Sequence, residues 1–200
     1  MENRADASEA LARSNMYGLL SRITRTEIDA ELLAAFRSPA VTAALGEAGV
    51  DLESALAGPD DPALLEQLST AYTHLFLLTV NPHESVQRGE GRLWGERTVA
   101  ANAFMEAAGL AVEGETSLLP DHVSMELAVM QHLAAEQAAS LAAGDQARAA
   151  DLQALQNRYL KEHLGAWGVT FFAAAEKAAS HPFYRQMAGL ARGFLHSELA

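Results

Sequence analysis

The sequence predicts an all-α fold, a helical bundle of roughly eight to ten helices with a central ordered loop or hinge. Alanine is abundant, β-branched residues are sparse, and apolar residues recur at helical spacing. The chain has no succession of strand, helix and strand patterns of the kind that builds a parallel sheet. Because its 200 residues contain no internal repeat and no low-complexity linker, we expect a single domain over residues 1–200.

Five helical segments are expected before the central loop. They run from an N-cap at Asp6 through Ile23, from Ile28 to Phe36, over short pieces at 41–45 and 52–56, and from Pro62 to about Leu78. Asp61 is expected to cap the last of these, with Pro62 at its first helical position.

The central loop extends from Thr79 to about Gly95. Its sequence, "TVNPHESVQRGEGRLWG", contains a proline and three glycines and shows no sustained hydrophobic periodicity. Irregular connections of that length inside a compact domain are often functional, so the loop is a candidate binding segment.

Helical periodicity resumes after this loop. The expected helices run from Glu96 to Ala108, from Asp121 to Ala143, from about Gln146 to Ala178, and from the "HPF" sequence at 181–183 onward. Gly109 and Gly144 follow the first two as C-terminal stops.

Charge and composition exclude several classes of function. The chain carries 26 acidic and 14 basic residues, a formal net charge of −12, and no run rich in lysine or arginine. Phosphate contacts need clustered cations, so we expect no nucleic-acid partner. With no cysteine, disulfides, thiolate metal sites and cysteine nucleophiles are excluded.

Neither a secretory signal nor a membrane span is expected. The N-terminus "MENRADASEALARS" lacks an apolar core, and the longest strongly apolar run, "LFLLTV", is far shorter than the ~18 residues that a span needs. We therefore expect a cytoplasmic protein.

The stretch "LPDHVSMEL" at 119–127 places Asp121 and His122 at a helix start, with Glu126 four residues beyond the histidine. One interpretation is a cap, in which Asp121 accepts a backbone N–H of the helix. A metal site is a second interpretation, since His122 and Glu126 share a helix face. The chain has no Glu-x-x-His motif, and its other histidines lack ligand spacing, so we expect no metal and no cofactor.

Catalytic signatures are also missing. There is no Gly-x-Ser-x-Gly elbow, and the glycines near Trp94 follow no strand and end in no Gly-Lys-Ser/Thr sequence. A binding module is therefore favoured over an enzyme. Trp94 itself either anchors the loop or meets a partner, and these alternatives stay open.

Several stretches, taken in order, resemble the TorD/DmsD/NarJ-type family of redox-enzyme maturation chaperones. The resemblance covers about residues 64–195 and is weaker at the N-terminus. Its pieces are "YTHLF" at 72–76, "NPHESV" at 81–86, "LWG" at 93–95, "PDHVSMEL" at 120–127, "HLGAW" at 163–167 and "HPFYRQMAGLARGFL" at 181–195.

That resemblance implies a cytoplasmic, all-helical chaperone of anaerobic respiration that is not an enzyme. Its implied partners are the twin-arginine leader peptide and the apo form of a molybdenum-containing oxidoreductase, with the chaperone a monomer or weak homodimer. By the resemblance, leader binding falls to these residues: Asp121, His122, Phe76, Pro82, Glu84, Ser85 and Trp94. The alternative is a helical protein that handles a guanine nucleotide or the molybdopterin cofactor.

Overall fold

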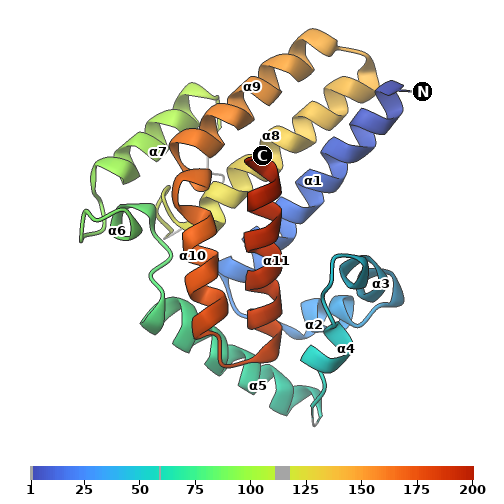
Figure 1. Ribbon diagram of the computed structural model, residues 1–200, viewed down its shortest axis with the longest axis vertical. Coiled ribbons are helices and arrows are strands. Elements are labelled where there is room, and N and C mark those ends of the chain that lie inside the picture. Colours follow the sequence, from blue (N-terminus) through green and yellow to red (C-terminus); the bar gives the residue numbers. More distant parts are fainter. Residues whose placement is uncertain (1, 59, 111–117) are drawn as a thin grey trace. The chain divides into compact units, whose positions relative to one another are not determined.

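The computed structural model describes residues 2–58, 60–110 and 118–200 and confirms the all-α prediction (Figure 1). The helices of the described residues are α1 (Glu2–Arg25), α2 (Ala30–Phe36), α3 (Pro39–Glu47), α4 (Leu52–Ala55), α5 (Asp61–Tyr72), α6 (Glu84–Gln87), α7 (Glu96–Ala107), α8 (Val123–Ala143), α9 (Gln146–Glu162), α10 (Leu164–Ala178) and α11 (Pro182–Glu198). Two of them, α4 and α6, are single turns. A π-helical segment, η1 (Thr73–Thr79), continues α5.

The chain folds into two compact units, each assembled from separated segments. The first unit contains residues 2–25 and 83–167, and the second unit contains residues 26–82 and 168–200. The helix α10 therefore gives its first turn to the first unit and the rest to the second. That the two units form one domain over residues 1–200 stays a prediction.

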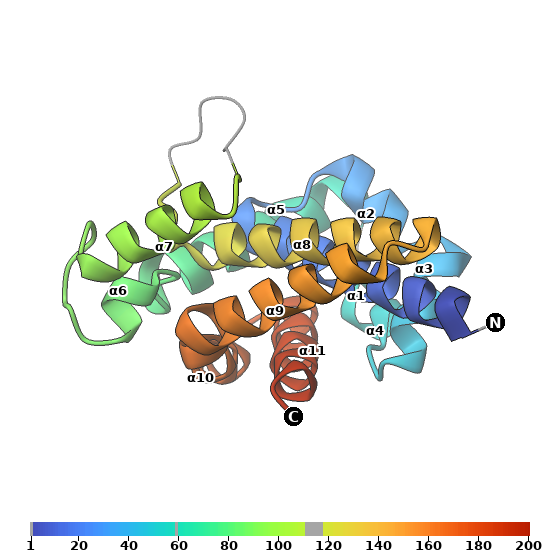
Figure 2. The same cartoon turned by 90° about the horizontal axis from the view of Figure 1, so that it is seen from above.

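In the first unit, α8 lies between α1 and α9 (Figure 1). The turn α6 lies beside α7 (Figure 2). Two serines fasten α1 to α8: Ser14 Oγ donates to the Gln131 carbonyl at 2.9 Å, and Ser21 Oγ to the Ser124 carbonyl at 2.8 Å. Between them, a Cβ added to Gly18 would lie 2.6 Å from Nε2 at the flexible end of the Gln131 side chain, which would have to shift.

Aromatic side chains fill the interior of the second unit. Phe76 lies within 6.3 Å, between ring centroids, of each of three other rings: Tyr72, Phe171 and Tyr184. Phe36 meets Phe183 edge to face, with centroids 5.1 Å apart. All six rings are buried, which agrees with the apolar spacing that predicted these helices.

The starts of α1 and α5 differ from the sequence prediction. The first helix already begins at Glu2, so Asp6 lies inside α1 and is not its cap. At α5, the cap is Asp60, whose side chain accepts from the Ala63 N–H, and Asp61 is the first helical residue. Neighbouring aspartates compete for a cap, and sequence spacing does not decide between them.

Two longer segments are also interrupted in ways that the sequence did not indicate. The expected loop from Thr79 to Gly95 contains the helical turn α6, and the expected helix over 146–178 breaks at His163 into α9 and α10. His163 has φ −123° and ψ −104°, which no helical residue adopts. Its conformation turns the side chain toward the site described below.

No helix in the described part of the chain has both the length and the apolar character that a bilayer crossing requires.

Candidate functional site

The candidate site lies in the first unit, where α6 meets the start of α8. His83 and His122 form an isolated antiparallel bridge, and their rings lie 5.0 Å apart. The Asp121 carbonyl accepts from the Glu84 N–H at 2.9 Å, and Asp121 Oδ2 accepts from the Ser85 N–H at 3.0 Å. Asp121 therefore holds the first two amides of α6.

The cap of α8 is His122, so the prediction that Asp121 caps this helix is wrong. His122 Nδ1 accepts from the Ser124 N–H at 3.2 Å, and Ser124 Oγ lies 2.8 Å from the same nitrogen. The pKa of His122 is lowered to about 4, mainly because the ring is buried. Of its charged neighbours, His83 and Arg25 lower the pKa and Asp121 raises it by less. A neutral ring is what this role requires, because only an unprotonated Nδ1 accepts.

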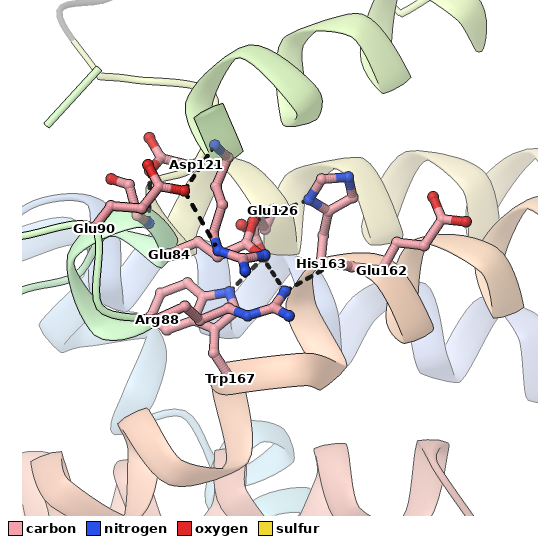
Figure 3. Close-up of polar contacts among 10 residues, drawn as sticks. Glu84, Arg88, Glu90, Asp121, Glu126, Glu162, His163 and Trp167 are labelled. Atoms are coloured by element: carbon pink, nitrogen blue, oxygen red, sulfur yellow. Dashed lines mark hydrogen bonds and ion pairs between the residues drawn. The ribbon is translucent and has the colours of Figure 1, made fainter. Parts of the chain in front are cut away.

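Glu84 is the charged centre of the site, although none of its side chain is exposed. Its Oε1 accepts from Arg88 Nη1 at 2.7 Å, and Arg97 Nη1 lies 3.5 Å away (Figure 3). Its Oε2 lies 3.0 Å from His163 Nδ1. Burial alone would raise the pKa of Glu84, but the hydrogen bonds from His163 and Arg88 outweigh it and hold the pKa below its usual value.

Glu126 lies beside Glu84, and its pKa is shifted in the opposite direction. It is fully buried, and its Oε2 accepts from Trp167 Nε1 at 3.0 Å. Burial and the negative charge of Glu84 raise the pKa of Glu126 well above its usual value. Glu84, Glu126 and His163 are all buried, and each offers a ligand atom within 4.8 Å of the others, so these three side chains could hold a metal ion.

Glu90 anchors the loop that follows α6. Its backbone N–H donates to the Ser85 carbonyl at 2.9 Å, and its Oε1 accepts from the Arg97 N–H at 3.1 Å, in the first turn of α7. A Cβ added to Gly95 would lie 1.5 Å from Glu90 Oε2, so any other residue at this position would displace the carboxylate from where it lies now.

Trp94 lies at the end of the same loop, directly before Gly95, the cap residue of α7. Its side chain is 72% exposed, and its backbone has φ 60°. That left-handed conformation is strained for any residue with a Cβ. Of the two alternatives for Trp94, an anchor for the loop or a contact for a partner, the first is disfavoured because the ring is not packed inside the fold.

The structure brings four of the predicted site residues together: Glu84, Ser85, Asp121 and His122. All four are buried. Trp94 belongs to the same loop but is exposed, whereas Phe76 and Pro82 belong to the second unit and are buried there.

Sequence reasoning missed His163, Arg88 and Trp167 as members of this network. It considered Glu126 only with His122, yet His122 uses Nδ1 for capping while Glu126 meets Trp167 and Glu84. One signal was present: Glu84 and Arg88 are four residues apart, a spacing at which opposite charges pair on a helix.

Comparison with known proteins gives two matches. The family model described as "Nitrate reductase delta subunit" matches residues 38–173, which is 136 of the 200 residues. The chain is also 28% identical over 209 aligned residues to the chaperone protein TorD of Shewanella piezotolerans, covering 94% of this chain and 91% of that relative.

Proposed function

The chain belongs to the nitrate reductase delta subunit family, and on that premise we propose that it is a chaperone for a molybdenum-dependent oxidoreductase. In this proposal it acts in the cytoplasm, as a monomer or weak homodimer, and catalyses no reaction. It binds the twin-arginine leader of the apo-enzyme and assists folding and cofactor loading before export or assembly.

One observation carries the proposal: a loop that is held in place by hydrogen bonds and exposes apolar side chains where it enters α7. The loop is held by Asp121 and Glu90 through the hydrogen bonds given above. At the end of the loop Leu93 is 44% exposed and Trp94 is 72% exposed, and Val99 on α7 is 66% exposed. Exposed apolar side chains concentrated in one short segment are typical of a surface that another protein covers.

A twin-arginine leader fits this surface chemically. Its apolar segment would cover the Trp94 ring, and its arginines would find an exposed carboxylate at Glu96, in the first turn of α7. The net charge of −12 would speed the encounter with a cationic peptide, and apolar burial would hold the complex.

We assign positioning roles, not direct contacts, to the buried residues of the site. Asp121 and Ser85 lie beneath the loop and have no exposed side-chain surface, and Glu84 and His122 are as deeply buried. In the proposed mechanism they fix the conformation in which the loop presents Trp94. A fixed loop pays less conformational entropy on binding than a loop that must first become ordered.

In the second unit, Phe76 and Pro82 have a comparable supporting role in the proposal. Phe76 is held among three aromatic rings, while the next two residues, Leu77 and Leu78, are 65% and 75% exposed. These two leucines lie in η1, a type of helix that is often found at functional sites. We propose that they, and not Phe76, touch the client.

The test is calorimetric titration with synthetic twin-arginine leaders of molybdenum-dependent oxidoreductases. Trp94→Ala should weaken binding by about 2 kcal/mol if the ring is a covered interface residue. The matched control is Leu11→Ala, because Leu11 is also in the first unit and 51% exposed but lies on α1. This control should bind like the wild type.

Replacing both leader arginines by glutamine should slow association, and raising the salt concentration to about 0.5 M should do the same with the natural leader. The proposal fails if no leader binds, or if Trp94→Ala and Leu11→Ala bind equally well.

A further inference from the structure

We propose that Glu84, Glu126 and His163 form a binding site for one divalent transition-metal ion, with Zn²⁺ as the probe. The three residues come from α6, α8 and the break between α9 and α10, and their ligand atoms lie within 4.8 Å of one another. This inference goes beyond the proposed function and does not depend on leader binding.

An unpaired oxygen is the second observation that points to a ligand. Glu126 is fully buried; its Oε2 is held by Trp167, whereas its Oε1 accepts from no donor in the described part of the chain and its carboxyl group interacts with that of Glu84. The hydroxyl groups of Ser85 and Tyr159, both buried, have no partner there either. Buried polar atoms without partners are costly, and a bound cation would satisfy the carboxylate oxygen.

The distances suit a small ion. In a tetrahedral zinc site with bonds of about 2.0–2.2 Å, neighbouring ligand atoms are about 3.3 Å apart. Glu84 Oε2 and His163 Nδ1 are 3.0 Å apart and share a hydrogen bond, so an ion that replaces the shared proton requires them to separate by only about 0.3 Å. With no ligand pair separated by more than 4.8 Å, the third ligand closes the site by a movement of at most about 1.5 Å.

Neighbouring groups orient the ligands as the outer contacts of metal sites do. Arg88 Nη1 binds Glu84 Oε1, so that Oε2 faces His163 Nδ1, and Trp167 Nε1 fixes the carboxylate of Glu126. Because the chain has no cysteine, the donors are nitrogen and oxygen, a set that suits Zn²⁺, Co²⁺ or Mn²⁺ better than Cu⁺.

The local charge also permits a dication. Because burial and Glu84 raise the pKa of Glu126, this carboxyl releases its proton when the ion binds. With Glu84, Asp121 and Glu126 then ionised against Arg88 and Arg97, the net charge is −1, and one divalent ion changes it to +1.

The experiment uses the untagged full chain after removal of metal with a chelator. Zn²⁺ is titrated by calorimetry, and bound zinc is measured after gel filtration. We expect one equivalent of zinc and a rise in melting temperature. Glu126→Gln keeps an oxygen acceptor for Trp167 but removes the charged ligand, so it should lose the equivalent. His163→Gln is the second variant, and it decides the question if Glu126→Gln does not fold.

The control is His74→Ala, because His74 is exposed in the second unit and reports zinc bound adventitiously at the surface. It should retain the equivalent. Absence of bound zinc in the wild type, or equal binding by both ligand variants, would overturn the inference. Leader titration of the metal-free protein tests the proposed chaperone function separately.

Discussion

The two units are built from different kinds of interior. Within the described residues, every buried polar or charged side chain apart from tyrosine lies in the first unit, including Glu84, Asp121 and Glu126. The second unit is filled by aromatic and aliphatic side chains, with Phe76 at the centre of a group of rings. Apolar packing therefore stabilises the second unit, whereas the first unit also depends on the protonation and pairing of its buried groups.

The largest effect is expected from a cavity in the second unit. Phe171 is buried against Phe76 and Phe172, with ring centroids 6.3 Å and 4.9 Å away. Phe171→Ala should lower the free energy of unfolding by about 3–5 kcal/mol, measured by urea denaturation, with little dependence on pH. Phe171→Leu, which leaves a smaller cavity, should lose clearly less. If the stability lost in Phe171→Ala depended strongly on pH, the interior of the second unit would also depend on titratable groups, and the contrast between the units would be wrong.

The second largest effect on stability is expected in the first unit, from protonation of His122. His122 has a pKa of about 4 in the folded protein and about 6.5 when unfolded, so folding favours its neutral form. The resulting stability is complete above pH 6.5 and is lost as the pH falls from about 6.5 through about 4. At full extent the loss is about 3 kcal/mol.

The measurement is urea denaturation across pH 4–7 for the wild type and His122→Asn, because asparagine caps a helix without titrating. The variant should lose less stability toward acid. His181 provides a matched control in the second unit: it caps α11, and its Nδ1 also accepts from a backbone N–H at 3.2 Å. Burial lowers the pKa of His181 as well, but the ring is only partly buried. Because of that, His181→Asn should change the acid profile less.

A smaller effect is expected at Asp121. Asp121→Ala leaves the buried Ser85 N–H without its acceptor and should cost about 1–3 kcal/mol. Asp121→Asn retains an acceptor oxygen and should cost less. Hydrogen exchange should show the loosened amides in α6 and not at the start of α8, because His122 caps α8. Faster exchange confined to α8 would contradict this assignment.

These two units also differ in how far the sequence could predict them. Apolar spacing identified the helices that carry Phe76, Phe171 and Phe183, because burial of one helix face is a local, periodic property. The site in the first unit joins Glu84, Glu126 and His163, which are 42 and 37 residues apart along the chain. No spacing rule pairs residues at such separations, since the break at His163 and the turn α6 arise from tertiary contacts.

The two neighbours in "PDH" illustrate the same limit at short range. Aspartate is the commoner N-cap, so the sequence favoured Asp121 for that role. In the fold, the side chain of Asp121 instead holds the Ser85 amide of α6, which leaves His122 to cap α8. A partner 36 residues away decided between two adjacent side chains.

The smallest expected effect on stability is at Trp94. Here the effect of the backbone conformation on stability can be separated from the effect of the ring on binding. Its left-handed φ of 60° costs any residue with a Cβ roughly 1 kcal/mol, while glycine adopts it freely. Trp94→Gly should therefore unfold at a higher temperature than Trp94→Ala, although both remove the same ring. Leader affinity should instead fall equally in both variants, because binding depends on the lost side chain. If affinity followed stability, with Trp94→Gly binding better than Trp94→Ala, the conformation of the loop and not the ring would be what the partner recognises.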